Sequence, residues 1–350
     1  MTHSAEKFLV ADLQGLILSD EERSRLSHTA LAGIILFARN FESRRQLIAL
    51  IDDIRSVNPE LLIMADQEGG RVQRFRGDGF TLVPPMGVLG QLYLTEPDAA
   101  LALTREIGWL LASELGACGI DLGLAPVLDL DRGISRVVGD RSFGACPEAV
   151  SALGVAYVAG LHEGGMSAVG KHFPGHGGVG ADSHTALPVD NRSAAEINDD
   201  LKPFEDLVKA GLDAVMPAHI RFPAVDSQAA GFSQQWLNNI LRQRIGFQGV
   251  VFSDCLSMAG ASIGGDIVAR TEKALSAGCD LALICNNPQD VVHLLACLDS
   301  GQMVVPGNGE ERAARIENMR SKCSVSWDEL FVSERRERVL EWITALVERA

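Results

Sequence analysis

Eight short apolar runs, most of them separated by a longer segment of helical character, constrain most strongly what this chain can fold into. The runs cover residues 8–13, 33–38, 61–66, 122–128, 167–170, 214–219, 249–254 and 281–285. Each is almost continuously apolar, as is typical of parallel strands covered on both faces. Helical spacing occurs at 44–57, 99–118, 147–163, 193–210, 234–245, 259–277 and 288–298. This alternation predicts an α/β fold, a (β/α)8 TIM barrel, with a doubly wound open sheet as the alternative.

The 350 residues fit one domain, because α/β barrels commonly run to about 250 residues or more as a single unit. We expect the barrel over about residues 8–300. The remainder contains charged helical segments at 310–322 and 327–349, which offer too little core to fold alone. We therefore predict a single domain over 1–350 with C-terminal helices packed on the barrel.

The net charge and the cysteine content indicate which partners and which cell compartment to expect. The net charge is −15, from 31 basic and 46 acidic residues, which argues against a nucleic-acid or anionic membrane partner. No apolar run approaches the ~18 residues of a transmembrane helix, and the first residues lack a signal-peptide pattern. The seven cysteines are odd in number and form no C-x-x-C pair. We expect reduced thiols in a cytoplasmic protein.

The segment from Lys171 to His184 has the composition of an active-site loop. Lys171 and His172 follow the fifth apolar run, and Asp182 and His184 stand two residues apart. In extended backbone Asp182 and His184 project to one side, so that the carboxylate can fix the tautomer of the imidazole. Such a histidine can donate a proton in one step and accept one in the next at neutral pH. The alternative is a buried, hydrogen-bonded histidine.

Several other polar residues stand at the C-terminal ends of the expected strands. These are Asp66, His219 and Asp254, which would meet Lys171 at one rim of a barrel. Asp254 is a candidate carboxylate nucleophile for attack on an anomeric carbon, where the transition state is oxocarbenium-like. Its alternative role is the N-cap of a helix that begins near Met258.

The residues after the third run suggest sugar binding. Asp66 can accept from two hydroxyls of a sugar ring, and Arg74 can orient this carboxylate or pair with it. Arg141 adds a fixed fork of donors. A surface salt bridge would explain any one of these arginines equally well.

A metal site is the competing chemical interpretation. His172, His176, Asp182 and His184 are all metal-ligand types. Pro174 and Gly175 interrupt the His-x-x-x-His spacing, so that it cannot lie on one helix.

Taken together, these motifs resemble the bacterial β-N-acetylglucosaminidases of glycoside hydrolase family 3, the cytoplasmic single-domain type that acts in cell-wall recycling. The resemblance covers about residues 11–285, and the motifs that carry it lie at 66–75, 125–129, 139–143, 171–177 with 182–184, and 252–258.

The resemblance implies a TIM barrel and a retaining double displacement. It assigns Asp254 as nucleophile and His184, oriented by Asp182, as general acid and base. The residues implied to hold the terminal N-acetylglucosamine are Asp66, Arg74, Arg141, Lys171 and His172. The implied substrate is N-acetylglucosamine β-1,4-linked to anhydro-N-acetylmuramic acid, with or without peptide. No metal or organic cofactor is implied, and we expect a monomer.

Two positions depart from the family pattern. Gly178 stands where the family usually has an aspartate, and Cys255 stands where the family usually has a second acid after its nucleophile. Loss of the first carboxylate is expected to loosen the anchoring of the loop. These changes leave open a sugar-binding protein that has kept the pocket and lost turnover.

Overall fold

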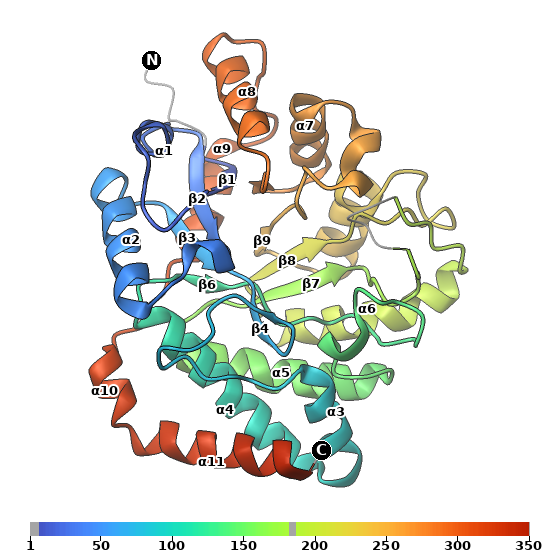
Figure 1. Cartoon of the computed structure of the whole chain (residues 1–350). Helices are drawn as coiled ribbons and strands as arrows, with labels where there is room; N and C mark the ends of the chain where they lie inside the picture. The colour runs from blue at the N-terminus through green and yellow to red at the C-terminus, as the bar shows by residue number, and fades with distance from the viewer. Residues whose placement is uncertain (1–6, 182–186, 350) are drawn as a thin grey trace.

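The core of the computed structural model, which describes residues 7–181 and 187–349, is built from parallel strands in two sheets (Figure 1). One sheet has the order β10-β1-β2-β3-β6 and the other β7-β8-β9. Their bounds are β1 (Leu9–Asp12), β2 (Leu31–Leu36), β3 (Leu62–Ala65), β6 (Leu122–Gly123), β7 (Val169–Phe173), β8 (Ala214–Pro217), β9 (Val250–Val251) and β10 (Ala282–Leu283). All eight predicted strands are therefore confirmed.

Isolated parallel bridges connect the two sheets at both ends. Val127, beyond β6, pairs with Lys171 of β7, and Phe252, beyond β9, pairs with Leu281 before β10. The strand order thus follows the chain order from β1 to β10 across both sheets.

Alternation of side chains along the strands divides the core into two clusters. One cluster takes residues from every one of the eight parallel strand segments, and its members include Val10 of β1, Leu62 and Met64 of β3, and Val169 of β7. Neighbouring residues in the same strands, such as Ile63 of β3, belong to the other cluster. Because successive strand residues point to opposite faces, both faces of the sheets are buried, which explains the continuous apolar runs.

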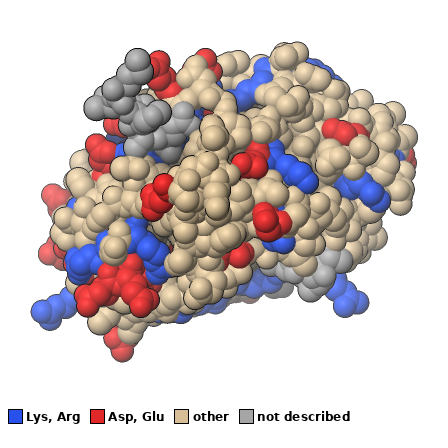
Figure 2. All heavy atoms as spheres, turned by 90° about the horizontal axis from the view of Figure 1, so that it is seen from above, with Lys and Arg blue, Asp and Glu red and all other residues tan. Residues whose placement is uncertain are grey.

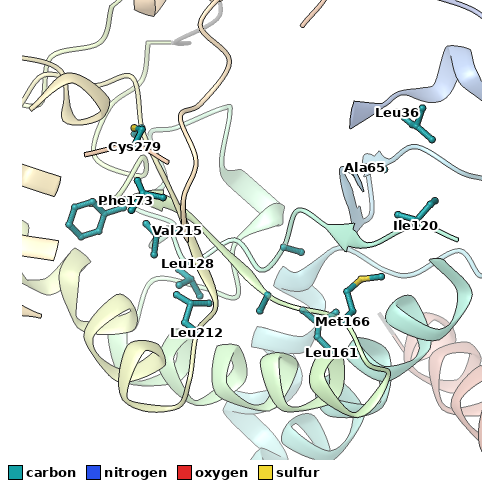
Figure 3. Close-up of a cluster of buried hydrophobic side chains, with 14 of the residues drawn as sticks. Leu36, Ala65, Ile120, Leu128, Leu161, Met166, Phe173, Leu212, Val215 and Cys279 are labelled. Carbon is teal, nitrogen blue, oxygen red and sulfur yellow. The ribbon is translucent and has the colours of Figure 1, made fainter. Parts of the chain in front are cut away.

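Helices cover the outer face of the strands and meet them in the larger cluster. They include α2 (Arg44–Val57), α4 (Pro97–Gly116), α5 (Pro147–Glu163), α6 (Ala194–Lys209), α7 (Ile267–Ala277) and α8 (Pro288–Asp299). Figure 3 shows part of this cluster, in which Leu128, Leu161 and Val215 lie between strands and helices. The predicted helices at 44–57 and 147–163 match at both ends.

Two predicted helices differ from the structure. The segment 259–277 is divided into a short 3₁₀ helix, η5 (Ala259–Gly264), and α7, because Gly265 adopts φ +104° between them. Asp266 then caps α7 by accepting from the Ala269 N–H. The segment predicted at 234–245 is a π-helix, η4 (Gln235–Arg244), with i→i+5 hydrogen bonds.

Two α-helices and one hairpin stand among the elements that were not predicted. They are α1 (Asp20–Leu26), α3 (Met86–Thr95) and an antiparallel hairpin of β4 (Gln67–Gly69) and β5 (Val72–Gln73). The hairpin directly follows β3 and carries polar side chains to the end of the sheet.

The C-terminal segment packs against α4 and β9. It forms α9 (Gly309–Glu317), α10 (Trp327–Phe331) and α11 (Glu334–Arg349), and α11 runs along α4 (Figure 1). Arg335 of α11 pairs with Glu106 of α4 at 2.7 Å, and Arg336 pairs with the buried Glu114 at 3.3 Å.

The surface carries both signs of charge. On the face seen from above, acidic and basic side chains lie interspersed among uncharged ones (Figure 2). Among the described residues, no helix is long and apolar enough to cross a membrane.

Candidate active site

A cavity of about 530 Å³ opens at the C-terminal ends of the strands. Its lining contains six of the predicted site residues: Asp66, Arg74, Arg141, Lys171, His172 and Asp254. The structure therefore brings these predicted residues together. Asp182 and His184 lie outside the described residues, and His219 is buried behind the cavity rather than in its wall.

Lys171 forms ion pairs with two carboxylates in the cavity wall. Residue 171 lies in β7, and its side chain is only 3% exposed. The Nζ atom is 2.9 Å from Asp66 Oδ1 and 2.7 Å from Glu68 Oε1. Because a buried ammonium is costly without partners, these two carboxylates are what allows a charged lysine at this position.

Two arginines extend this ion pair into a chain of alternating charge. Arg74 Nη2 donates to Asp66 Oδ2 at 2.7 Å. Arg141 donates to both Glu68 oxygens at 2.8 Å. The Arg141 and Glu68 side chains are 10% and 3% exposed, so this is a buried bidentate pair and not the surface salt bridge considered above.

The pKa values of this chain reflect the balance between burial and attraction. Burial favours the neutral carboxyl, but the charges of Lys171 and Arg141 outweigh it and lower the pKa of Glu68 to about 2. The same competition with Lys171 and Arg74 lowers the pKa of Asp66. Burial opposes the charge of Lys171, yet Asp66 and Glu68 raise its pKa. All three groups are therefore ionised at neutral pH.

We expect this cluster to make stability sensitive to acid. The pKa of Glu68 is about 2 in the folded protein and about 4.3 in an unfolded chain, so the stabilisation is complete above about pH 4.5. It is lost as the pH falls toward 2, by on the order of 3 kcal/mol for Glu68. Urea unfolding between pH 5 and 2.5 measures the slope of the free energy of unfolding against pH. Glu68→Gln should flatten it, and an unchanged slope in that variant would contradict the assignment.

A second buried carboxylate fixes His172 of β7 and His176 of the loop that follows this strand. Asp129 Oδ2 lies 2.7 Å from His172 Nδ1. Asp129 Oδ1 accepts from the backbone N–H groups of His172 and His176 at 3.1 and 2.7 Å. Burial acts against ionisation, but the two histidines and these hydrogen bonds lower the pKa of Asp129 to about 2. An ionised Asp129 accepts a hydrogen bond from His172 Nδ1–H, so that Nε2 is the ring nitrogen left to contact a ligand.

Asp254 follows β9 and lines the cavity. It comes from the sheet β7-β8-β9, whereas Asp66 follows β3 of the other sheet. Asp254 does not cap the following helix, because η5 begins after Met258 and Asp254 Oδ1 accepts instead from the Cys255 N–H at 2.7 Å. Within the described residues, no lysine, arginine or histidine forms an ion pair with Asp254. The negative charge is therefore available to a ligand.

His219 supports the segment that carries Asp254. Its Nε2 atom lies 3.0 Å from the Cys255 carbonyl oxygen. Burial lowers the pKa of His219, although the nearby Asp254 opposes this, so that the ring is neutral at pH 7 and donates to the carbonyl. His219 is a positioning residue in this structure.

The structure explains the departure at Gly178 and places the other departing residue, Cys255, in the cavity wall. A side chain at Gly178 would overlap the Arg192 guanidinium and the Asp190 carboxylate, which are ion-paired at 2.6 Å. This pair, extended by Arg192 to Asp200, occupies the place where an aspartate would project. Cys255 lines the cavity with its Sγ 3.8 Å from the Cys285 carbonyl oxygen, so a thiol stands beside Asp254.

Two charged residues of the site were missed by the sequence interpretation. Glu68 stands two residues after Asp66 in an extended segment, the same spacing that suggested Asp182 and His184. Asp129 follows the fourth apolar run, as Asp66 follows the third. Both signals were present in the sequence.

The metal interpretation receives no support from the described part of the chain. Within residues 7–181 and 187–349, no group of three or more histidine, cysteine or acidic side chains is arranged to hold a metal ion. Of the four predicted ligands, Asp182 and His184 lie outside these residues, and His172 bonds to Asp129.

Comparison with known proteins shows the family of the chain. Residues 8–319 match the family model described as the glycosyl hydrolase family 3 N terminal domain. The chain is 51% identical to a beta-hexosaminidase of Chromobacterium violaceum over 93% of this chain and 90% of that protein. A beta-hexosaminidase of Bordetella avium is 49% identical, over 93% of this chain and 92% of that protein.

A solved structure is also similar along its whole length. This is NagZ from Neisseria gonorrhoeae in complex with N-trifluoroacetyl-D-glucosamine, at a TM-score of 0.89 and 42% identity. The match covers 99% of each chain.

Proposed function

Because the chain belongs to glycoside hydrolase family 3 and is a β-N-acetylhexosaminidase, we propose that it removes terminal N-acetylglucosamine from N-acetylglucosamine-β-1,4-anhydro-N-acetylmuramic acid. The substrate carries a peptide or lacks one, and the reaction belongs to cytoplasmic cell-wall recycling. The observation that carries this proposal is the Asp254 carboxylate, which has no ion-pair partner among the described residues and lines a cavity of about 530 Å³. The other wall of this cavity is a chain of ionised donors and acceptors. A cavity of this size suits a small ligand.

The binding roles follow from the chemistry of the wall. Asp66, already held by Lys171 and Arg74, accepts hydrogen bonds from two ring hydroxyls. Arg74, Arg141, Lys171 and His172 donate to the remaining oxygens of the sugar. Because these groups fix one another, the sugar binds to side chains that are already ordered, which reduces the entropy cost of binding.

The proposed reaction is a retaining double displacement. Asp254 attacks the anomeric carbon, forms a glycosyl ester, and the bond to the leaving oxygen breaks. His184 donates its proton to that oxygen, with Asp182 holding the imidazole. His184 then takes a proton from water, and the water oxygen displaces Asp254 with a second inversion.

We propose further that the two sheets are parts of one (β/α)8 barrel that spans about residues 8–300. The bridges Val127–Lys171 and Phe252–Leu281 and the shared interior cluster support closure. The chain would then act as a single catalytic domain and as a monomer, with residues 301–350 packed on the barrel.

Hydrolysis of 4-nitrophenyl N-acetyl-β-glucosaminide is the test of this function. We expect turnover of this substrate, little turnover of 4-nitrophenyl β-glucoside, and no effect of EDTA. Loss of activity with EDTA would favour a metal-dependent hydrolase. Sugar binding without turnover would favour the sugar-binding protein.

Removal of His184 should affect substrates according to their leaving group. His184→Ala should lower kcat/KM on the natural disaccharide by about 10²–10⁴-fold, because the sugar leaving group needs a proton. The loss on the 4-nitrophenyl substrate should be much smaller, since nitrophenolate leaves without one. Steady-state kinetics on both substrates measure the ratio, and equal losses would contradict His184 as the acid.

A further inference from the structure

The charges that line the cavity are mostly compensated by one another. The lining contains Asp66 and Asp254 as acids, and its described basic residues are Arg71, Arg74, Arg136, Arg141 and Lys171. Asp66 pairs with Arg74 and Lys171, while Glu68, behind the wall, pairs with Arg141 and Lys171. The cavity wall is thus rich in cations, in a protein whose net charge is −15.

The guanidinium of Arg71 also has hydrogen-bond partners within the protein. Its Nε lies 3.3 Å from Asp140, and its Nη2 donates to the carbonyl oxygens of Arg136 and Val137 at 3.1 and 2.6 Å. These bonds tie the tip of the β4–β5 hairpin to the segment 136–138. Arg71 therefore serves to hold the rim in place.

Arg136 is different. Within the residues that the structure describes, its guanidinium forms no hydrogen bond, ion pair or ring contact, although its residue lines the cavity. Its position is exposed, whereas Lys171 and Arg141 at the wall are 3% and 10% exposed in their side chains. Arg136 is thus a free cation at the mouth, and Asp254 is the uncompensated anion deeper in the cavity.

The depth of the two charges assigns them to different parts of a ligand. A terminal sugar that reaches Asp254 fills the inner part, so its aglycone must extend toward the mouth. We propose that Arg136 is a specificity-determining residue that binds a carboxylate on the aglycone of the substrate, an inference that rests on the proposed function. The ligand class is a β-N-acetylglucosaminide whose second sugar carries a carboxylate, such as the lactyl group of a muramic acid.

The backbone around Arg136 supports this role. Arg71 fixes the carbonyl oxygens on either side of Val137, and Arg141 Nη1 donates to Val137 O at 3.0 Å. The segment that carries the free guanidinium is therefore bonded to the hairpin and to the buried Arg141–Glu68 pair. A cation on a fixed backbone loses less entropy when it binds a carboxylate than one on a free loop.

The test compares two substrates that differ in charge. One is N-acetylglucosamine-β-1,4-anhydro-N-acetylmuramic acid, and the other is the same disaccharide with its lactyl carboxylate converted to the methyl amide. We expect Arg136→Gln to lower kcat/KM on the acid by about 10- to 100-fold, as for loss of a charge-assisted hydrogen bond. The loss on the amide should stay within about twofold, and Arg136→Lys should restore part of the activity on the acid. Added salt should lower the preference of the parent enzyme for the acid.

Arg45→Gln is the matched control, because Arg45 is an exposed arginine of α2 outside the cavity lining. Arg45→Gln should leave kcat/KM unchanged on both the acid and the amide. Equal losses on acid and amide in Arg136→Gln, or no loss on either, would overturn the inference while the proposed function stands. Failure of the parent to hydrolyse both disaccharides and 4-nitrophenyl N-acetyl-β-glucosaminide would instead overturn the proposed function, and this inference with it.

Discussion

Replacement of Asp254 by alanine is expected to lower kcat on 4-nitrophenyl N-acetyl-β-glucosaminide by roughly 10⁴-fold or more, the scale found when a nucleophile is removed. Asp254 lines the cavity without an ion-pair partner in the described part of the chain, whereas Asp66 of the same lining is held by Arg74 and Lys171. Steady-state kinetics measure the loss. The free energy of unfolding should stay within a few kcal/mol of the parent, as expected of a partly buried residue at a strand end.

A control variant at another carboxylate and the addition of azide test whether Asp254 is the nucleophile. Asp52→Ala removes an exposed carboxylate of α2 and should leave kcat unchanged. If Asp254 is the nucleophile of a retaining reaction, azide should enter the space left in Asp254→Ala and form the α-glycosyl azide. Full activity of the variant, or a β-configured azide product, would refute the assignment.

Replacement of Lys171 by methionine is expected to lower the free energy of unfolding at pH 7 by about 3–5 kcal/mol, the cost of leaving buried charges without their partner. Both Asp66 and Glu68 lose the cation that lies 2.9 and 2.7 Å away, while the volume of the side chain is nearly kept. Urea denaturation measures this change. Binding of N-acetylglucosamine should weaken as well, because Asp66 loses one of the two groups that orient it.

The pH dependence separates charge from packing in this variant. At pH 4 the difference from the parent should be smaller, since the two carboxyls without Lys171 take up protons more readily. Lys202→Met removes a lysine that is 40% exposed and paired with Asp206, and it should change stability by less than about 1 kcal/mol. A Lys171→Met protein as stable as the parent at pH 7 would show that the ion pairs do not stabilise the fold.

Much of the fold could be predicted from the sequence because the periodicity of apolar residues carries it. The eight strands and the helices at 44–57 and 147–163 follow from continuous apolar runs and helical spacing. The division at Gly265 was missed because an amphipathic pattern continues across it. The β4–β5 hairpin was missed because its polar residues give no hydrophobic signal.

The candidate site was predictable to a lesser degree. The positions of Asp66, Lys171 and Asp254 at strand ends are readable from the sequence, since parallel strands share one C-terminal edge. The pairing of these charges with one another cannot be predicted from the sequence. Lys171 pairs with Asp66 across 105 residues of sequence, and the positions of Glu68 and Asp129 in the sequence do not show which cation each carboxylate meets.

The sequence by itself determined the kinds of element, their order, the family, and the residue types at the strand ends, because local periodicity and short motifs need no knowledge of what lies beside them. Only the tertiary structure decided that Lys171 is shared by two carboxylates and that Asp129 holds His172. It also decided that Arg136 and Asp254 line one cavity without an ion-pair partner in residues 7–181 and 187–349. The physical reason is that an ion pair depends on a separation of about 3 Å between atoms. That separation is set by strand register and by burial, which neighbours in space impose on residues far apart in the chain.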